Sequence, residues 1–472
     1  MSEVVIVGGG IAGLAAAYRL TQAAPGASIT LVESESRLGG KIVTERVDGF
    51  VIEGGPDTFL AYKPRGVGLC RDLGLGDRLH GTNPALRRTY IARGERLYDL
   101  PEGLTGLIPS RFGPMAKTAL LSPLGKLRMG LDYVIPPRRA PEDESIASFV
   151  SRRLGQEVYD RLVEPLLSGI YAGDGEQLSL AATFPQLQQT ERAHGGLIKG
   201  MLAARQNGHR PTPSANGRSA FVTPTTGLAE IVEALEARLR AAGVRLRLGE
   251  HVKRVERAAG GYGVTLANGA VLPAEAVILA TPAFVTAELL AGLDETAAAA
   301  LRAIPYVSTA TVSLAYPLAD IPRPLDGYGY LIPRAENRPI LACTWTSTKF
   351  PHRAPEGSGL IRAFVGRAGQ ADVLAGTDAA VVNLVRAELR RTLGITAAPM
   401  LQRVFRWPRA MPQYTLGHLD RVRVIEARLA ALPGLVVAGN AYRGIGLPDC
   451  IASGEAAAEA AAQIIEGTPT HA

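Results

Sequence analysis

The chain of 472 residues contains few cysteines, histidines and lysines, and each scarcity excludes a class of protein. Three cysteines, Cys70, Cys343 and Cys450, lack the spacing of a metal or redox motif, and so low a count is typical of the reducing cytoplasm. The seven histidines form no pair with ligand spacing, so we predict no metal site. No apolar run reaches the roughly 18 residues that a membrane-spanning helix needs, so none is predicted.

Arginine dominates the charge, since only seven of the 51 basic residues are lysine and the net charge is +7. Basic residues are spread along the chain without a long run or interleaved aromatic side chains, so we do not expect a nucleic-acid partner. A weak attraction to anionic lipid or to a polyanionic substrate stays open. The hydrophobic content of 47% is ordinary for a folded protein, and the length allows two or three domains with large cores.

The N-terminal stretch has the pattern of a dinucleotide-binding unit. Val4–Val7 is a continuous β-branched run, which predicts a strand buried on both faces. Gly8, Gly10 and Gly13 follow in GxGxxG spacing, where they permit a tight turn, close approach of a pyrophosphate, and close packing of helix on strand. The free N–H groups of the following helix would face the phosphates.

The elements after the glycines agree with this interpretation. A helix is expected over residues 11–22, and a second strand over 28–32 runs into Glu33. This acid lies about 20 residues beyond the glycines, where it can accept hydrogen bonds from the ribose hydroxyls. The pattern therefore predicts a bound adenine dinucleotide. Because the first strand begins at residue 4, we expect no signal peptide before it.

Three later segments indicate which dinucleotide binds. Residues 33–41 read ESESRLGGK, in which Gly39 and Gly40 let the chain pass close to a ligand while Arg37 and Lys41 supply cations. Residues 50–57 read FVIEGGPD. Residues 434–454 run from an apolar strand through several glycines, and an alanine-rich helix is expected over 455–465.

These segments resemble the flavin-binding amine-oxidase superfamily, where an acid, an RxGG[RK] motif and a Gly-Gly loop against the isoalloxazine occur in this order. In that superfamily the C-terminal segment closes over the flavin. The resemblance implies non-covalent FAD, with the backbone of Val252 against the adenine and Trp407 near the flavin. The motif and the resemblance together give these cofactor residues: Gly8, Gly10, Ile11, Ala12, Gly13, Glu33, Ser34, Arg37, Gly39, Gly40, Lys41, Gly54, Gly55, Pro56, Asp57, Val252, Thr281, Trp407, Gly439, Asn440, Gly446, Leu447 and Ile451.

Motifs in the interior resemble a narrower group, the oxygen-dependent porphyrinogen oxidases of haem synthesis. They are GIYAGD at 169–174, GYLIP at 329–333, MPQYTLGH at 411–418 and GNAYRGIG at 439–446. The group acts on coproporphyrinogen III or on protoporphyrinogen IX, and GIYAGD is more similar to the first type. The resemblance implies a six-electron oxidation of coproporphyrinogen III to coproporphyrin III, with dioxygen reduced to hydrogen peroxide. Protoporphyrinogen IX is the alternative substrate.

The same resemblance implies the substrate residues. Lys63 and Arg65 fall where the group places a cation for a propionate, and Gly329 lies beside Leu331 in the wall that, with Phe364, would sandwich the macrocycle. Tyr171 would lie near the substrate. Each has a plainer explanation: surface charges, ordinary sheet-core residues and a buried structural tyrosine. No catalytic acid or base is assigned, because hydride passes to flavin N5 and aromatisation drives the loss of the pyrrole proton.

Other functions stay open at this point. A second GxGxxG motif is absent, which disfavours a reductase fed by NAD(P)H. A flavin amine oxidase often carries a cysteine that attaches the flavin covalently, and Cys450 does not match that pattern. A carotenoid desaturase requires an apolar tunnel for its substrate, and the cations at 63 and 65 argue against such a tunnel. A non-catalytic FAD-binding partner of a haem enzyme also remains.

The expected fold is mixed α/β and α+β, with a discontinuous Rossmann-like FAD-binding domain, a mixed-sheet substrate domain and a helical insertion. A cavity is expected where they meet. Residues 101–140 are apolar and punctuated by Pro, Gly and cations, which predicts either a separate helical core or peripheral contact with the inner face of the membrane. We expect a monomer or dimer, with a transient ferrochelatase contact left open. The domains are expected to span 1–62, 225–285 and 432–472 (FAD), 63–90, 205–224 and 286–431 (substrate), and 91–204 (helical).

Overall fold

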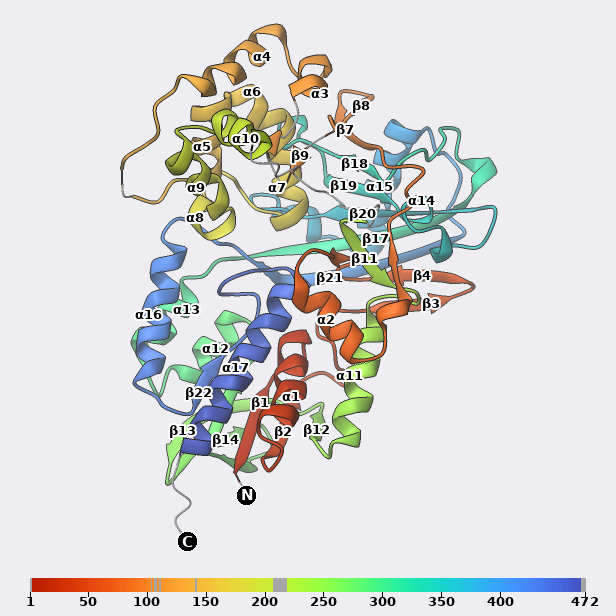
Figure 1. The fold of residues 1–472 in the computed structure, drawn as a ribbon. Helices are drawn as coiled ribbons and strands as arrows, with labels where there is room; N and C mark the ends of the chain where they lie inside the picture. The colour runs from red at the N-terminus through yellow and green to blue at the C-terminus, as the bar shows by residue number, and fades with distance from the viewer. Residues whose placement is uncertain are drawn as a thin grey trace.

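The computed structural model describes residues 2–102, 104–105, 108–109, 112–140, 142–206 and 219–467. Figure 1 shows a parallel sheet with its helices at the bottom, a large mixed sheet across the middle and a group of helices at the top. A polar linker is predicted over 203–220, and most of it lies outside the described residues. The expected fold class is confirmed.

The parallel sheet draws its strands from three distant parts of the chain. Its order is β12-β2-β1-β16-β22, and each neighbouring pair is parallel. Helix α1 (Ile11–Ala23) packs with α17 (Leu447–Gly467), while α11 (Ala229–Ala241) also packs on α1. These helices cover one face, and side chains such as Val255, Leu290 and Leu301 pack on the other, so both faces are covered, as the β-branched run at the start of the chain predicts. The strands are β1 Glu3–Val7, β2 Ser28–Glu33, β12 Arg245–Leu248, β16 Ala276–Leu279 and β22 Leu435–Val437.

Smaller elements connect this sheet to the rest. The hairpin β3–β4 carries the predicted Gly-Gly loop at its end, and the three-stranded sheet β13-β14-β15 turns at Asn268-Gly269 as expected. Their bounds are β3 Thr44–Val47, β4 Phe50–Glu53, β5 Phe59–Leu60, β6 Leu79–Gly81, β11 Phe221–Pro224, β13 Val252–Ala258, β14 Gly261–Leu266, β15 Val271–Ala274, α2 Pro64–Asp72, α12 Ala283–Leu290, α13 Glu295–Arg302 and α16 His418–Ala430.

The large sheet has seven strands in the order β21-β17-β20-β19-β18-β7-β8. Only the β18–β7 pair is parallel, and helix α15 (Asp378–Leu393) packs on the apolar face. Apolar residues alternate around Arg93-Gly94-Glu95, a pattern that predicts a hairpin, and the hairpin is confirmed as β7–β8 of this sheet. The strands are β7 Thr89–Arg93, β8 Arg96–Asp99, β17 Tyr306–Pro317, β18 Gly329–Leu331, β19 Ile340–Trp345, β20 Ser358–Val365 and β21 Leu401–Pro412.

The sequence pattern of residues 400–407 predicts a strand that ends at Trp407, and β21 departs from this prediction. The strand continues through Pro408 to Pro412, with an irregular register opposite Val307 and Thr309. Proline lacks an N–H donor and is tolerated on edge strands and at bulges. Because β21 is an edge strand, the bulge accommodates Pro408 and lets the strand reach the functional site.

Helix α17 also begins earlier than expected, at Leu447 instead of Glu455. Pro448 lies in the first turn, where a missing N–H costs nothing. Gly454 lies within the helix because a Cβ there would come 2.1 Å from the carbonyl oxygen of Ala12. The glycine therefore serves helix packing, and the sequence pattern alone suggests a loop.

The helical part has its own core, built on side chains such as Phe149, Leu162 and Leu178. A fully buried ion pair between Arg153 and Asp132 (2.5 Å) lies within it. None of the described helices is long and apolar enough to cross a membrane. Its helices are α3 Phe112–Lys117, α4 Pro123–Gly130, α5 Ile146–Leu154, α6 Gln156–Val158, α7 Glu164–Tyr171, α8 Leu180–Thr183, α9 Pro185–His194 and α10 Leu197–Gln206.

Candidate functional site

The turn between β1 and α1 is built for close approach of a ligand. A Cβ at Gly13 would lie 1.9 Å from the Gly8 carbonyl oxygen, so helix and strand pack as the motif requires. Around Gly10, by contrast, no heavy atom lies within 4 Å of a built Cβ. No side chain caps α1, so the first-turn N–H groups, including those of Ile11 and Ala12, are free to receive an anion.

Glu33 ends β2 beside this turn, with its carboxylate fixed in place. One oxygen accepts a hydrogen bond from the Gly9 backbone N–H (2.6 Å), and the other accepts from Ser34 Oγ (3.1 Å) and the Glu35 N–H (2.9 Å). Ser34 thus orients the acid. Val252 and Thr281, two further predicted cofactor residues, lie near this acid. The Glu250 N–H donates to the Glu33 carbonyl, and Val252 begins β13 two residues later. The Thr281 methyl lies 3.4 Å from a Cβ built on Gly8.

The Gly39-Gly40 turn forms the second wall of the cradle. The Gly39 N–H donates to the Gly9 carbonyl (2.8 Å), and a Cβ at Gly40 would lie 3.2 Å from Gly10 Cα. Arg37 donates to carbonyl oxygens of its own turn, including that of Gly40 (2.7 Å), so it holds the turn in shape.

Lys41 has a different environment from Arg37. Among the described residues its ammonium makes no ion pair or hydrogen bond, and burial lowers its pKa. A cation in this position favours an anionic ligand group, because pairing would offset the loss of hydration.

The Gly54-Gly55-Pro56-Asp57 segment packs directly on the Lys41 backbone. A Cβ at Gly55 would come 1.8 Å from the Lys41 carbonyl oxygen, so only glycine fits. The Gly54 carbonyl accepts hydrogen bonds from Thr311 Oγ1 and Trp407 Nε1, each at 2.8 Å. Trp407, six residues along β21, thereby fixes the loop that we expected against the flavin.

Asp57 belongs to a cluster of charged side chains that the sequence did not predict. Its carboxylate pairs with Lys349 (2.9 Å), and the cations around it hold its pKa well below the ordinary range despite burial. Next to it, Glu53 pairs with Arg353 (3.0 Å), although burial raises the Glu53 pKa. Arg362 completes the cluster. The signal in the sequence was an arginine within the otherwise apolar strand LIRAFV.

The C-terminal segment lies across the carboxyl edge of the parallel sheet. The Gly439 N–H donates to Ser453 Oγ (3.0 Å), and the Asn440 carbonyl accepts from the Tyr414 hydroxyl (2.7 Å). Tyr414 also receives the Gly444 N–H (2.8 Å). The Gly446 N–H donates to Asp449 at the start of α17, where Leu447 and Ile451 are buried.

The expected substrate wall is assembled around Ala172. Leu331 and Phe364, predicted to sandwich a macrocycle, both pack on the cluster of Ala172, Leu341 and Ala342. Gly329 has φ of 130° and a Cβ there would lie 2.0 Å from the Cys343 carbonyl oxygen, so glycine is required beside Leu331.

Tyr171 is buried next to this wall. Its ring lies 6.2 Å from that of Tyr414, and its backbone carbonyl accepts a hydrogen bond from Gln413 Nε2 (2.9 Å). Burial, reinforced by the charge of Asp449, raises the pKa of Tyr171, so the phenol stays neutral. The GIYAGD and MPQY motifs are thus joined directly by a hydrogen bond.

The two predicted propionate cations are each paired with an acid of α17. Lys63 contacts both carboxylate oxygens of Asp449 at 2.6 Å, and Arg65 pairs with Glu455. These pairs dock α2 onto α17. The Lys63 side chain retains one third of its exposure (33%), so it keeps donors available for a second anion.

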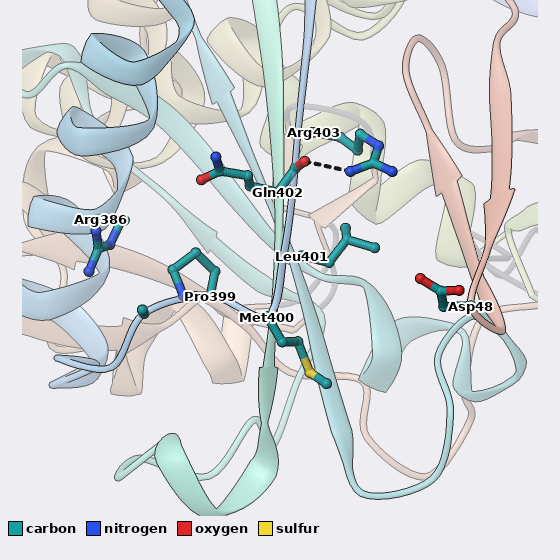
Figure 2. Close-up of a pocket in the computed structure, with 8 residues that line it drawn as sticks. Asp48, Arg386, Pro399, Met400, Leu401, Gln402 and Arg403 are labelled. Atoms are coloured by element: carbon teal, nitrogen blue, oxygen red, sulfur yellow. Dashed lines mark hydrogen bonds between the residues drawn. The ribbon is translucent and has the colours of Figure 1, made fainter.

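A separate hollow of about 500 Å³ lies elsewhere, at the start of β21 (Figure 2). At about 3.3 Å per strand residue, its edge at Leu401 is roughly 20 Å from Trp407. Arg403 lines this hollow, but its guanidinium is already paired with Glu45 (2.7 Å). Its lining is Asp48, Arg386, Ala398, Pro399, Met400, Leu401, Gln402 and Arg403.

The parallel sheet, the uncapped α1, the position of Glu33 at the end of β2 and the second glycine turn are the features of a dinucleotide-dependent oxidoreductase. Comparison with known proteins narrows this class. The model of the family described as flavin containing amine oxidoreductase matches residues 11–462, and the chain belongs to this family.

Three similar proteins illustrate the relationship. The chain is 39% identical to "Coproporphyrinogen III oxidase" of Bacillus subtilis (strain 168), covering 96% of this chain and 97% of that one. It is 34% identical to human "Protoporphyrinogen oxidase", covering 96% and 97%. A solved structure from Exiguobacterium sp. 255-15, described as a candidate protoporphyrinogen oxidase, superposes with a TM-score of 0.85 at 34% identity, covering 98% of each chain.

FAD is the cofactor, and the residues present fit it. The open space at Gly10, the free N–H groups of α1 and the unpaired Lys41 ammonium suit a pyrophosphate, while Glu33 suits a ribose. Gly439 likewise has no heavy atom within 4 Å of a built Cβ, which leaves room along the C-terminal segment.

Proposed function

We propose that this chain oxidises coproporphyrinogen III to coproporphyrin III. The observation that carries the proposal is similarity along almost the whole chain to a protein named for that activity. Over the full reaction six electrons and six protons leave the substrate, and three dioxygen molecules become three hydrogen peroxide molecules. FAD supplies the two-electron chemistry when bound.

The chain's own residues shape and orient the reactants. Leu331 and Phe364 offer the macrocycle one apolar surface, since both flank Ala342 in the sheet and pack on the cluster of Ala172, Leu341 and Ala342. Trp407 fixes the Gly54 carbonyl, which holds the loop beside the flavin position. Tyr171 stays protonated, so it can donate a hydrogen bond but does not take up a pyrrole proton, which leaves for solvent.

Lys63 and Arg65 are proposed to receive substrate carboxylates. Both are partly exposed, and each shares its charge with an acid of α17. A substrate carboxylate would therefore bind as a third member of each pair, with charge-assisted hydrogen bonds to the remaining N–H donors. Coproporphyrinogen carries four carboxylates, and we propose that two of them engage these two cations.

Protoporphyrinogen IX oxidation is the second candidate, since relatives with that name are similar over equal lengths. The test is aerobic oxidation of both porphyrinogens by FAD-loaded protein, followed by porphyrin fluorescence and peroxide formation. We expect a higher kcat/KM for coproporphyrinogen III. A preference for protoporphyrinogen IX would assign the chain to the second activity, and oxidation of neither by flavin-bearing protein would refute both.

We also propose that the helical part touches the inner face of an anionic membrane. Three apolar side chains on or just after α4 are largely exposed, Leu124 (77%), Leu127 (67%) and Val134 (69%), and α4 lies at the end of the molecule opposite the parallel sheet (Figure 1). Lys126 lies between the two leucines. Replacing both leucines by serine should abolish co-flotation with anionic vesicles. Retained flotation would show that another surface binds, while an equal change at exposed Leu318 is the control.

We also propose the division into three domains that the sequence predicts, and a transient handover of the product to a ferrochelatase. The parallel sheet draws on the start, middle and end of the chain, which supports a discontinuous FAD domain. Co-elution of the chain with a ferrochelatase during turnover, and its loss without substrate, is the measurement for the handover.

A further inference from the structure

Arg362 on β20 is a fully buried cation without a paired acid. It is 2% exposed, and no carboxylate of the described chain lies within ion-pair distance of it. One Nη donates to the Gly55 carbonyl, while Nε and the other Nη are buried without a hydrogen-bond partner. Burial of an unpaired charge destabilises a fold, so an arginine in this position calls for a functional explanation.

The position of Arg362 links two parts of the proposed active site. The Gly55 carbonyl belongs to the loop that packs on Lys41 and Trp407, the proposed flavin side. The guanidinium carbon lies 4.7 Å from the centre of the Phe364 ring, the proposed substrate side. A single side chain therefore contacts both walls through a hydrogen bond and a cation–π contact.

The surrounding carboxylates compensate the charge of Arg362 only in part. Glu53 is occupied by Arg353 (3.0 Å) and Asp57 by Lys349 (2.9 Å). This cluster contains three cations and two carboxylates, so it carries one surplus positive charge. All five side chains are partly or fully buried. In a low-dielectric interior such a charge acts strongly on groups beside it.

We propose that Arg362 is a positioning residue that fixes the Gly55 loop against Phe364, and that its surplus charge raises the reduction potential of the bound flavin. The physical reason is that the cofactor gains negative charge on reduction, which a nearby fixed cation stabilises. The inference rests on the FAD site of the proposed function but is independent of which porphyrinogen is oxidised.

The test measures the midpoint potential and the visible spectrum of FAD-loaded variants by dye equilibration. Arg362→Met removes the charge and keeps the length, and we expect its redox equilibrium to shift at least tenfold, about 30 mV lower for a two-electron couple. Arg362→Lys keeps the charge and should stay near wild type. Arg153→Met removes an equally buried arginine from the helical part, so it should lower the melting temperature with no change in potential.

An unchanged potential in flavin-bearing Arg362→Met would overturn the proposal, as would equal shifts in the Met and Lys variants. If the Met variant does not retain FAD, Arg362→Gln carries the same expectation, since it preserves a donor for the Gly55 carbonyl without charge. Failure of the wild-type chain to bind FAD would instead refute the proposed function.

Discussion

Replacing Gly10 by alanine should separate the stability of the fold from its affinity for FAD. Gly10 has φ of −70° and ψ of 174°, which alanine adopts without strain, and no heavy atom lies within 4 Å of the added methyl. The apoprotein should therefore be unchanged or more stable, by about 0.4–1 kcal/mol, because the unfolded chain loses freedom. The methyl would occupy the space reserved for the pyrophosphate.

With the phosphate displaced, we expect FAD to bind at least 100-fold more weakly, which is about 2.8 kcal/mol at roughly 1.4 kcal/mol per tenfold. Two comparisons bracket the result. Gly68→Ala lies in α2 with open space around it and should leave FAD binding unchanged. Gly13→Ala would place a Cβ 1.9 Å from the Gly8 carbonyl oxygen and should destabilise the apoprotein itself.

The assays are thermal unfolding of the apoprotein and titration with FAD, followed by quenching of flavin fluorescence. An affinity within threefold of wild type for Gly10→Ala would show that the dinucleotide does not cross this turn. A loss of apoprotein stability at Gly10 as large as that at Gly13 would show that the space at Gly10 is not open.

Three further predictions concern the substrate wall, the cations and acid stability. Phe364→Ala should lower kcat/KM for the porphyrinogen by about 10- to 100-fold, since burying a large apolar side chain is worth about 1.5–3 kcal/mol, while the flavin spectrum stays unchanged. Lys63→Met should raise KM for coproporphyrinogen III more than for protoporphyrinogen IX, whereas the exposed Arg423→Met should change neither. Burial lowers the pKa of His418 to about 4, so the unfolded chain binds the extra proton first as the pH falls below about 6.5. Stability should therefore decline by roughly 3 kcal/mol between pH 6.5 and 4, and denaturant unfolding of His418→Phe should show a smaller decline; an equal decline would exclude His418 as the cause.

Local patterns predicted the strand, helix and strand of the N-terminal βαβ unit. The glycine spacing, the β-branched strand and Glu33 lie within one βαβ unit, so their geometry follows from short-range rules. The resemblance placed the Gly-Gly loop and Trp407 each near the flavin, and the structure joins the two by a hydrogen bond.

Long-range pairing was beyond the reach of such patterns. The acids that pair with Lys63 and Arg65 lie on α17, 386 and 390 residues later in the chain. The Arg362 cluster likewise joins a loop near residue 55 to strand β20. The early start of α17 was missed because Pro448 and Gly454 are locally typical of loops, while their actual roles depend on the helix start and on contact with α1.

The assembly of the parallel sheet has a consequence for synthesis of the chain on the ribosome. Strand β22 and helix α17 complete the layer that β1 and α1 begin, so β1 and α1 must wait until these much later segments have been made. Pairings of such high sequence separation form slowly and leave apolar surface exposed meanwhile. The complete FAD site forms only once these distant segments have come together, so cofactor supply should govern the yield of native protein.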